Sequence, residues 1–120
     1  MKREDDFATR RVHLAKLSDE ELKELFWNLT EKVIDPLLTL GYENTTPAIE
    51  RSVLLRMGFS SLEVAQIVTE SEERGLLGYG AGHAVYKLAK IKAMPIREAG
   101  LALAAGEYWQ EVQTAFEANN

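Results

Sequence analysis

The sequence predicts an all-α protein, and three observations support this fold class. Apolar residues recur at helical spacing, Ser or Thr residues suited to capping precede several of these stretches, and glycines or prolines separate them. No run of alternating β-branched residues reaches the length of a strand. We therefore expect one compact helical domain over residues 1–120, a bundle of about five to seven short helices plus one long helix near the N-terminus.

The long helix is expected to follow a short helix at residues 6–15. Ser18 is a candidate N-cap, and Glu21 completes a capping box with it. Pro36 should kink or restart the helix because proline lacks an N–H and crowds the preceding turn, and Gly41 should end it as the C′ residue. The apolar residues of this helix follow at helical spacing: Leu22, Leu25, Phe26, Leu29, Val33, Leu37 and Leu40.

Two shorter helices should come next, each with a recognisable start. Thr46 is a candidate N-cap for a helix over residues 47–57, in which proline occupies the first turn. Ser60 and Glu63 form a second capping box, which predicts a helix running from there to about residue 74.

Three more helices are expected in the last third of the chain, over residues 81–93, 95–105 and 107–117, with Gly106 between the last two. The inward side of the first should carry Ala81, Ala84, Val85, Leu88 and Ile91. One face of the last should carry Tyr108, Trp109, Val112, Ala115 and Phe116.

Composition excludes several classes of function. The chain has 120 residues and no cysteine, which excludes disulfides, thiolate catalysis and cysteine-bound zinc or iron–sulfur clusters. Its net charge of −5 argues against nucleic acid as the main partner. No apolar run approaches the roughly 20 residues of a membrane span, so no membrane is expected as a partner. The polar start, residues 1–6, does not resemble a signal peptide, which favours a cytoplasmic location.

A glycine-rich segment at residues 73–83 interrupts the helical pattern, with glycines at positions 75, 78, 80 and 82. Such a cluster indicates positive φ angles or close backbone approach. A dinucleotide-binding fingerprint is incomplete here, because His83 stands where its third glycine belongs, and the Gly-Lys-Ser/Thr of a P-loop is absent. The segment is therefore interpreted as a backbone docking surface, with an anion site at the start of the following helix as the alternative.

His83, Lys87 and Lys90 fall on one side of the helix that follows this segment, with Lys92 and Arg97 nearby. This basic stripe is either a solvated polar face or a grip for an acidic partner surface. The two histidines of the chain lie far apart in sequence and have no metal-binding motif, so no metal site is expected. The candidate interface is Gly78, Tyr79, Gly80, Gly82, His83, Lys87 and Lys90.

Several stretches together resemble a known family over nearly the whole chain. They are the opening Met-Lys-Arg-Glu-Asp-Asp-Phe, the Leu-Ser-Asp-Glu-Glu-Leu-Lys at 17–23, the run at 45–61 that begins Thr-Thr-Pro-Ala-Ile-Glu-Arg, and the run at 75–89 that begins Gly-Leu-Leu-Gly-Tyr-Gly-Ala-Gly-His. The chain resembles the small (S, or alpha) subunits of D-ornithine 4,5-aminomutase. None of these stretches is a catalytic motif.

The resemblance implies a large partner subunit with a TIM-barrel and a Rossmann-like domain, which binds pyridoxal phosphate and adenosylcobalamin. The holoenzyme of that family converts D-ornithine to 2,4-diaminopentanoate by a radical 1,2-amino shift in amino-acid fermentation. The present chain is expected to be its accessory subunit, inactive alone, with no catalytic, cofactor or metal residues. It contains neither the Asp-x-His-x-x-Gly cobalamin loop nor the length of a barrel, in agreement with that expectation.

Two other classes of function stay open from the residues alone. One is a free-standing, non-catalytic helical adaptor that binds an acidic partner surface through His83, Lys87 and Lys90. The other is a small anion-binding regulator that uses residues 78–82.

Overall fold

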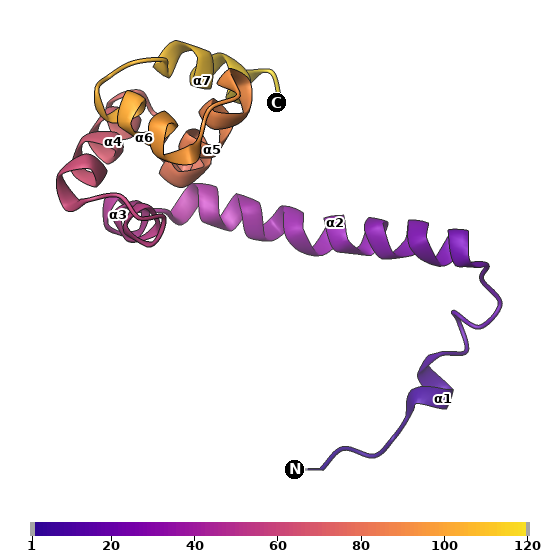
Figure 1. Ribbon diagram of the computed structural model, residues 1–120. Coiled ribbons are helices and arrows are strands. Elements are labelled where there is room, and N and C mark those ends of the chain that lie inside the picture. Colours follow the sequence, from indigo (N-terminus) through magenta and orange to yellow (C-terminus); the bar gives the residue numbers. More distant parts are fainter. Residues whose placement is uncertain (1, 120) are drawn as a thin grey trace. The chain divides into compact units, whose positions relative to one another are not determined.

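The computed structural model describes residues 2–119, and every regular element in that range is helical (Figure 1). This confirms the all-α prediction and the long helix near the N-terminus. In order, the elements are α1 (Phe7–Arg10), α2 (Asp19–Asn44), α3 (Pro47–Arg56), α4 (Ser61–Glu73), the 3₁₀ helix η1 (Leu77–Tyr79), α5 (Ala81–Lys92), α6 (Ile96–Ala104) and α7 (Trp109–Glu117). By their internal contacts they divide into two units, Met1–Leu38 and Thr39–Asn120.

The first helix is shorter than predicted. Helix α1 covers only Phe7–Arg10, and the chain continues as turns to residue 16, whereas a helix over 6–15 was expected. None of its residues is buried. A helix this short gains few hydrogen bonds for the residues it orders, and it has no buried face to extend it.

Helix α2 begins as predicted but ends later. The Ser18 hydroxyl accepts from the Glu21 N–H at 3.2 Å, and the Glu21 carboxylate accepts from the Ser18 N–H at 2.8 Å, which confirms the capping box. The helix then runs through Pro36 without restarting and passes Gly41 to end at Asn44. The prediction of an end at Gly41 was wrong because this glycine keeps a helical φ, and the Asn44 side chain hydrogen-bonds a carbonyl of the last turn instead.

Helices α3 and α4 begin at the predicted caps. The Thr46 hydroxyl accepts from the Ile49 N–H at 3.3 Å. The Ser60 hydroxyl accepts from the Glu63 N–H at 3.4 Å, and Glu63 accepts from the Ser60 N–H at 2.8 Å. Both caps satisfy N–H groups that a helix start leaves without partners.

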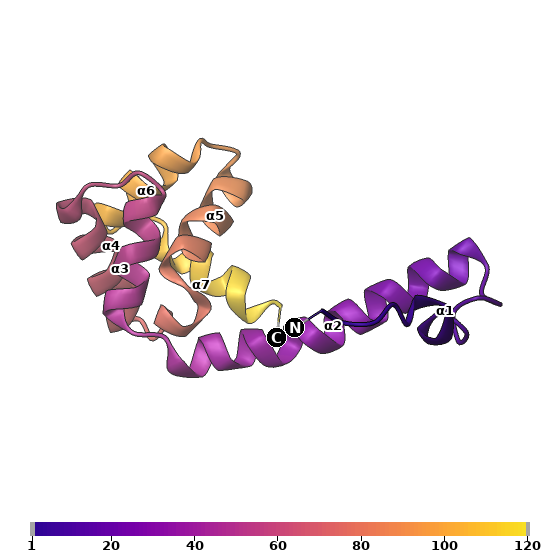
Figure 2. The ribbon, with the colours of Figure 1, turned by 90° about the horizontal axis from the view of Figure 1, so that it is seen from below.

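Within the second unit, helix α5 contacts α3, α4, η1, α6 and α7 (Figure 2). Its buried residues are Ala81, Gly82, Ala84, Val85, Leu88 and Ala89. The predicted inward position of Ile91 was wrong, since this side chain is exposed and Ala89 is buried instead. Ala89 lies two turns after Gly82 on the same side of α5, and α3 packs on that side at Gly82.

The last helix begins two residues later than expected. Gly106 and Tyr108 both have positive φ angles, 84° and 62°, so the chain becomes helical only at Trp109. Tyr108, predicted to share a face with Trp109, precedes the helix and is exposed, whereas Trp109 is buried. The buried indole of Trp109 donates a hydrogen bond to the Leu103 carbonyl of α6 at 3.0 Å, which fixes where α7 starts.

A methyl group at Gly100 should destabilise the second unit. A Cβ atom there would lie 2.1 Å from two ring atoms of Phe59, which is itself buried. Gly100→Ala is expected to lower the melting temperature by about 5 °C or more, since overpacking costs about 1–3 kcal/mol. Gly41→Ala is the matched control, because nothing lies within 4 Å of that position, and alanine is the better helix former there. Thermal unfolding followed by circular dichroism checks both; equal melting temperatures for Gly100→Ala and the wild type would contradict the packing described.

The ion pair between α4 and α6 should make stability depend on acid pH. The Arg97 side chain donates two hydrogen bonds to Glu63, at 2.7 and 2.8 Å, and together with the Ser60 N–H it lowers the pKa of Glu63 from 4.5. A lowered native pKa stabilises the fold above the unfolded value and stops doing so as the pH falls through the native value. The wild type should therefore melt above Glu63→Gln at about pH 7, and the gap should close as the pH falls below the ordinary value of 4.5. A gap that stays constant down to acid pH would refute this role of the charge.

Candidate interaction surfaces

The start of α5 is closed by a carboxylate from α3. Glu50 is only 7% exposed, and its Oε2 accepts the N–H of Ala81, the first residue of α5, at 2.7 Å. Its Oε1 accepts a hydrogen bond from the Thr45 hydroxyl at 2.6 Å. The cap residue of α5, Gly80, has no side chain to perform this task. A negative group at this end is also favoured by the helix dipole, so the position that an external anion would take is filled by the chain itself.

The glycines of the segment have the positive φ angles and close contacts that their clustering predicted, and these contacts are made within the chain. Gly75 and Gly80 have positive φ angles of 68° and 95°. A Cβ on Gly78 would lie 2.9 Å from the Tyr42 ring, and one on Gly82 would lie 2.9 Å from the sulfur of Met57. The close backbone approach is therefore made by α3 and by the end of α2, and the glycines need no outside partner to explain them.

An aromatic cluster surrounds the same segment. The ring of Tyr79 stacks on Phe116 with centroids 4.6 Å apart, and Tyr42 meets it edge-on at 5.1 Å. His83 packs against Phe116 at 5.2 Å, and its Nδ1 lies 3.3 Å from the Tyr79 carbonyl. These contacts give Tyr79 and His83 structural roles within the second unit.

The basic stripe is only partly available to a partner. Lys92 pairs with Glu111 at 3.2 Å, and Arg97 is held by Glu63, so both have partners within the chain. Among the described residues, no ion pair with a carboxylate involves Lys87 or Lys90. Lys87 is half-buried, whereas Lys90 and His83 are exposed. Of the seven predicted interface residues, these three are the ones whose side chains could meet a partner, and the interface itself stays a prediction.

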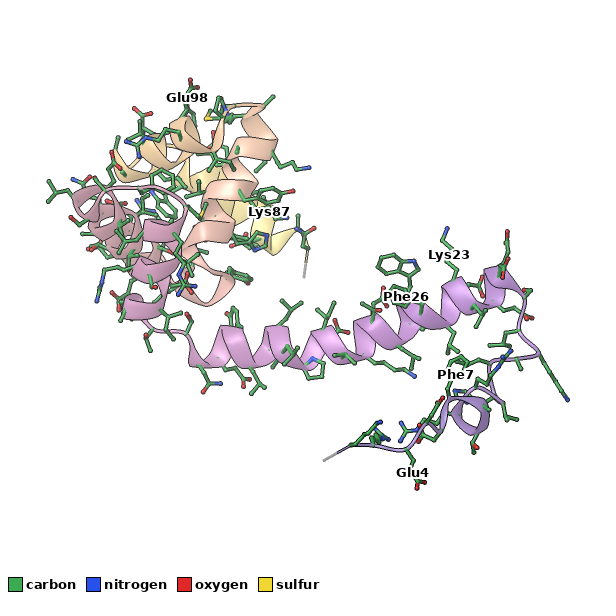
Figure 3. All side chains as sticks on the ribbon, turned by 60° about the horizontal axis from the view of Figure 1, so that its bottom comes forward. Glu4, Phe7, Lys23, Phe26, Lys87 and Glu98 are labelled. Atoms are coloured by element: carbon green, nitrogen blue, oxygen red, sulfur yellow. The ribbon has the colours of Figure 1, made fainter. Side chains whose placement is uncertain are left out.

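Helix α2 presents the most extensive apolar surface. None of its 26 residues is buried. Phe26, Leu29, Val33 and Leu37, which we call the α2 apolar face, are 60%, 50%, 64% and 60% exposed, and Figure 3 shows side chains standing out along this helix, Phe26 among them. Soluble proteins seldom leave a continuous apolar stripe uncovered, so this face indicates a binding surface.

The hollows on α2 and beside α4 are open to solvent. A hollow of about 670 Å³ on α2 is lined by three carboxylates and one lysine together with Trp27 and Asn28, and it opens to solvent. Among the residues described, no three His, Asp or Glu side chains are placed to hold a metal ion. No described helix is long and apolar enough to cross a membrane.

Sequence reasoning missed the two features that matter most here. Glu50 was not singled out from the sequence, because nothing local shows that its side chain reaches a residue 31 positions away. The α2 apolar face was recognised as a helical stripe but was not predicted to be a binding surface. Its length was the available clue, because no other stretch of helical pattern is long enough to cover it.

The fold gives the structural class first: the described residues form an all-α protein with an exposed apolar side along α2. The comparisons then give the family. Residues 2–116 match the family described as D-ornithine 4,5-aminomutase alpha-subunit. The chain is 62% identical over 117 residues to the D-ornithine 4,5-aminomutase subunit alpha of Acetoanaerobium sticklandii, covering 98% of this chain and 97% of that one. The chain therefore belongs to the D-ornithine 4,5-aminomutase alpha-subunit family.

Removing the Glu50 carboxylate should weaken the second unit. Glu50→Ala leaves the Ala81 N–H and the Thr45 hydroxyl without their acceptor in a buried place, which costs about 1–3 kcal/mol. Glu50→Gln keeps one acceptor oxygen but loses the charge, so its melting temperature should fall between those of Glu50→Ala and the wild type. Glu73→Ala, at an exposed position near the end of α4, is the matched control and should not lower the melting temperature. If Glu50→Ala has the melting temperature of the wild type, this carboxylate does not stabilise the start of α5.

Proposed function

We propose that this chain is the accessory subunit of a D-ornithine 4,5-aminomutase and supports a large subunit that carries the cofactors and the reaction. In this proposal the large subunit binds pyridoxal phosphate and adenosylcobalamin and converts D-ornithine to 2,4-diaminopentanoate by radical amino migration. The present chain contributes no catalytic residue. Membership in the alpha-subunit family supports the assignment to an aminomutase, and a subunit implies a partner.

The residues of this chain do not fit pyridoxal phosphate. Pyridoxal phosphate requires a lysine in a pocket shielded from water, together with donors for its phosphate. Every described lysine is exposed except Lys87, which is half-buried, and the one lysine that lines a sizeable hollow, Lys23, shares it with three carboxylates. The start of α5, the helix end most suited to a phosphate, already holds the Glu50 carboxylate. A supporting role is therefore the function that these residues fit best.

The observation that carries the proposal is the uncovered apolar side of α2. Burying an exposed Val, Leu or Phe side chain contributes roughly 1.5–3 kcal/mol, so several such side chains on one helix can drive tight association. An obligate partner explains why the chain keeps such a face, since apolar side chains left in water promote aggregation.

Reconstitution tests this function directly. The chain and the large subunit from the same organism are co-expressed, purified as a complex, supplied with both cofactors and assayed for 2,4-diaminopentanoate formed from D-ornithine. The complex should be active, the isolated chain should show no turnover, and the large subunit alone should be at least about tenfold less active or should fail to stay soluble. Turnover by the isolated chain, or full activity of the large subunit without it, would contradict the proposal.

A second candidate function is a free-standing adaptor that binds an acidic protein through the basic stripe. The observation that favours it is that Lys87 and Lys90 lack a carboxylate partner among the described residues. The same co-expression decides between the two, because an adaptor of this kind would not co-purify with a cofactor-binding aminomutase subunit.

A further inference from the structure

We propose that the α2 apolar face is the surface that binds the large aminomutase subunit, and that it docks into an apolar groove bordered by basic side chains. This inference rests on the proposed function. It places the principal contact on α2 and not on the glycine-rich segment or the basic stripe.

The first step is the pattern of exposure along α2. Phe26, Leu29, Val33 and Leu37 follow one another at steps of three and four residues, so they lie on one side of a regular helix. Each of them is at least half exposed. Helices that lay an apolar side into a groove use anchors at this spacing.

The length of α2 indicates that its apolar side is covered by another molecule. Helix α2 has 26 residues and spans about 39 Å, whereas α4, with 13 residues, is the next longest described helix and spans about 20 Å. No other element in residues 2–119 can run along the whole of α2. A much larger partner can offer a groove of that length.

The third step is charge, which argues against a second copy of this chain. Helix α2 carries seven Asp and Glu residues against two Lys, a net charge of −5. Two such helices packed side by side would repel each other, whereas basic side chains around a groove would be attracted. The partner surface is therefore inferred to be apolar at its centre and basic at its border.

Phe26 supplies the largest ring of the α2 apolar face, and large aromatic rings dominate the energetics of interfaces. Phe26 and Trp27 meet edge to face with centroids 5.2 Å apart, and both rings are more than half exposed. Phe26 belongs to the α2 apolar face, whereas Trp27 follows it by one residue and therefore points about 100° away around the helix.

The test compares two double variants of the full chain for binding to the purified large subunit. Leu29→Asp with Val33→Asp places two charges on the α2 apolar face. This double variant should raise the dissociation constant by about 100-fold or more. The matched control is Leu62→Asp with Leu101→Asp, at positions 80% and 41% exposed on α4 and α6, and it should bind as the wild type does. Circular dichroism melts should show that both variants keep the wild-type fold of the second unit.

Each outcome of this titration decides the inference. Loss of affinity confined to the α2 variant supports it. Equal affinity of the α2 variant and the wild type overturns it and leaves the proposed function standing, with the contact elsewhere. No binding by the wild type overturns both the inference and the proposed function.

Salt and self-association provide the second readout. Affinity for the large subunit should fall as the salt concentration rises, because opposite charges attract across the interface. Analytical ultracentrifugation of the isolated chain should give a monomer. A dimer that the α2 variant abolishes, together with unchanged affinity for the large subunit, would show that a second copy covers this face and would overturn the inference.

Discussion

The second unit depends on the hydrogen bond between the Glu50 carboxylate and the first N–H of α5. Helix α5 contacts every other helix from α3 to α7, so the way it begins determines where they can pack. Glycine at position 80 lets the chain turn with φ near 95° but offers no capping side chain, and Glu50 of α3 supplies the missing acceptor. Gly82 then allows α3 to pack directly against α5. The Glu50 carboxylate therefore links α3 to α5, and Gly80 and Gly82 allow the two helices to approach closely.

The same arrangement limits what the glycine-rich segment can do. An anion site needs free N–H groups at a helix start, and here a buried carboxylate occupies that place and would repel a second negative charge. The ring of Tyr79 is likewise packed in the aromatic cluster around Phe116. What the chain offers to other molecules is therefore a set of faces, of which the α2 apolar face is the most extensive.

Local features of the fold could be predicted from sequence, and features that depend on distant packing could not. The capping boxes at Ser18 and Ser60 were predicted correctly, because a cap involves residues three positions apart. The exposure of Ile91 and the late start of α7 were missed, because each depends on how another helix approaches. The positive φ angles of the glycine-rich segment were predicted. The side chains that contact it, such as Tyr42, were not, because they come from elsewhere in the chain.

In the proposed complex, the glycine-rich segment makes its contacts within this chain, and α2 binds the large subunit. Amide hydrogen exchange, measured on the isolated chain and on its complex with that subunit, tests the claim most directly. The amides of residues 26–40 should exchange much more slowly in the complex, whereas the exchange rates of residues 78–90 should change little. Slower exchange confined to residues 78–90, with α2 unchanged, would contradict it.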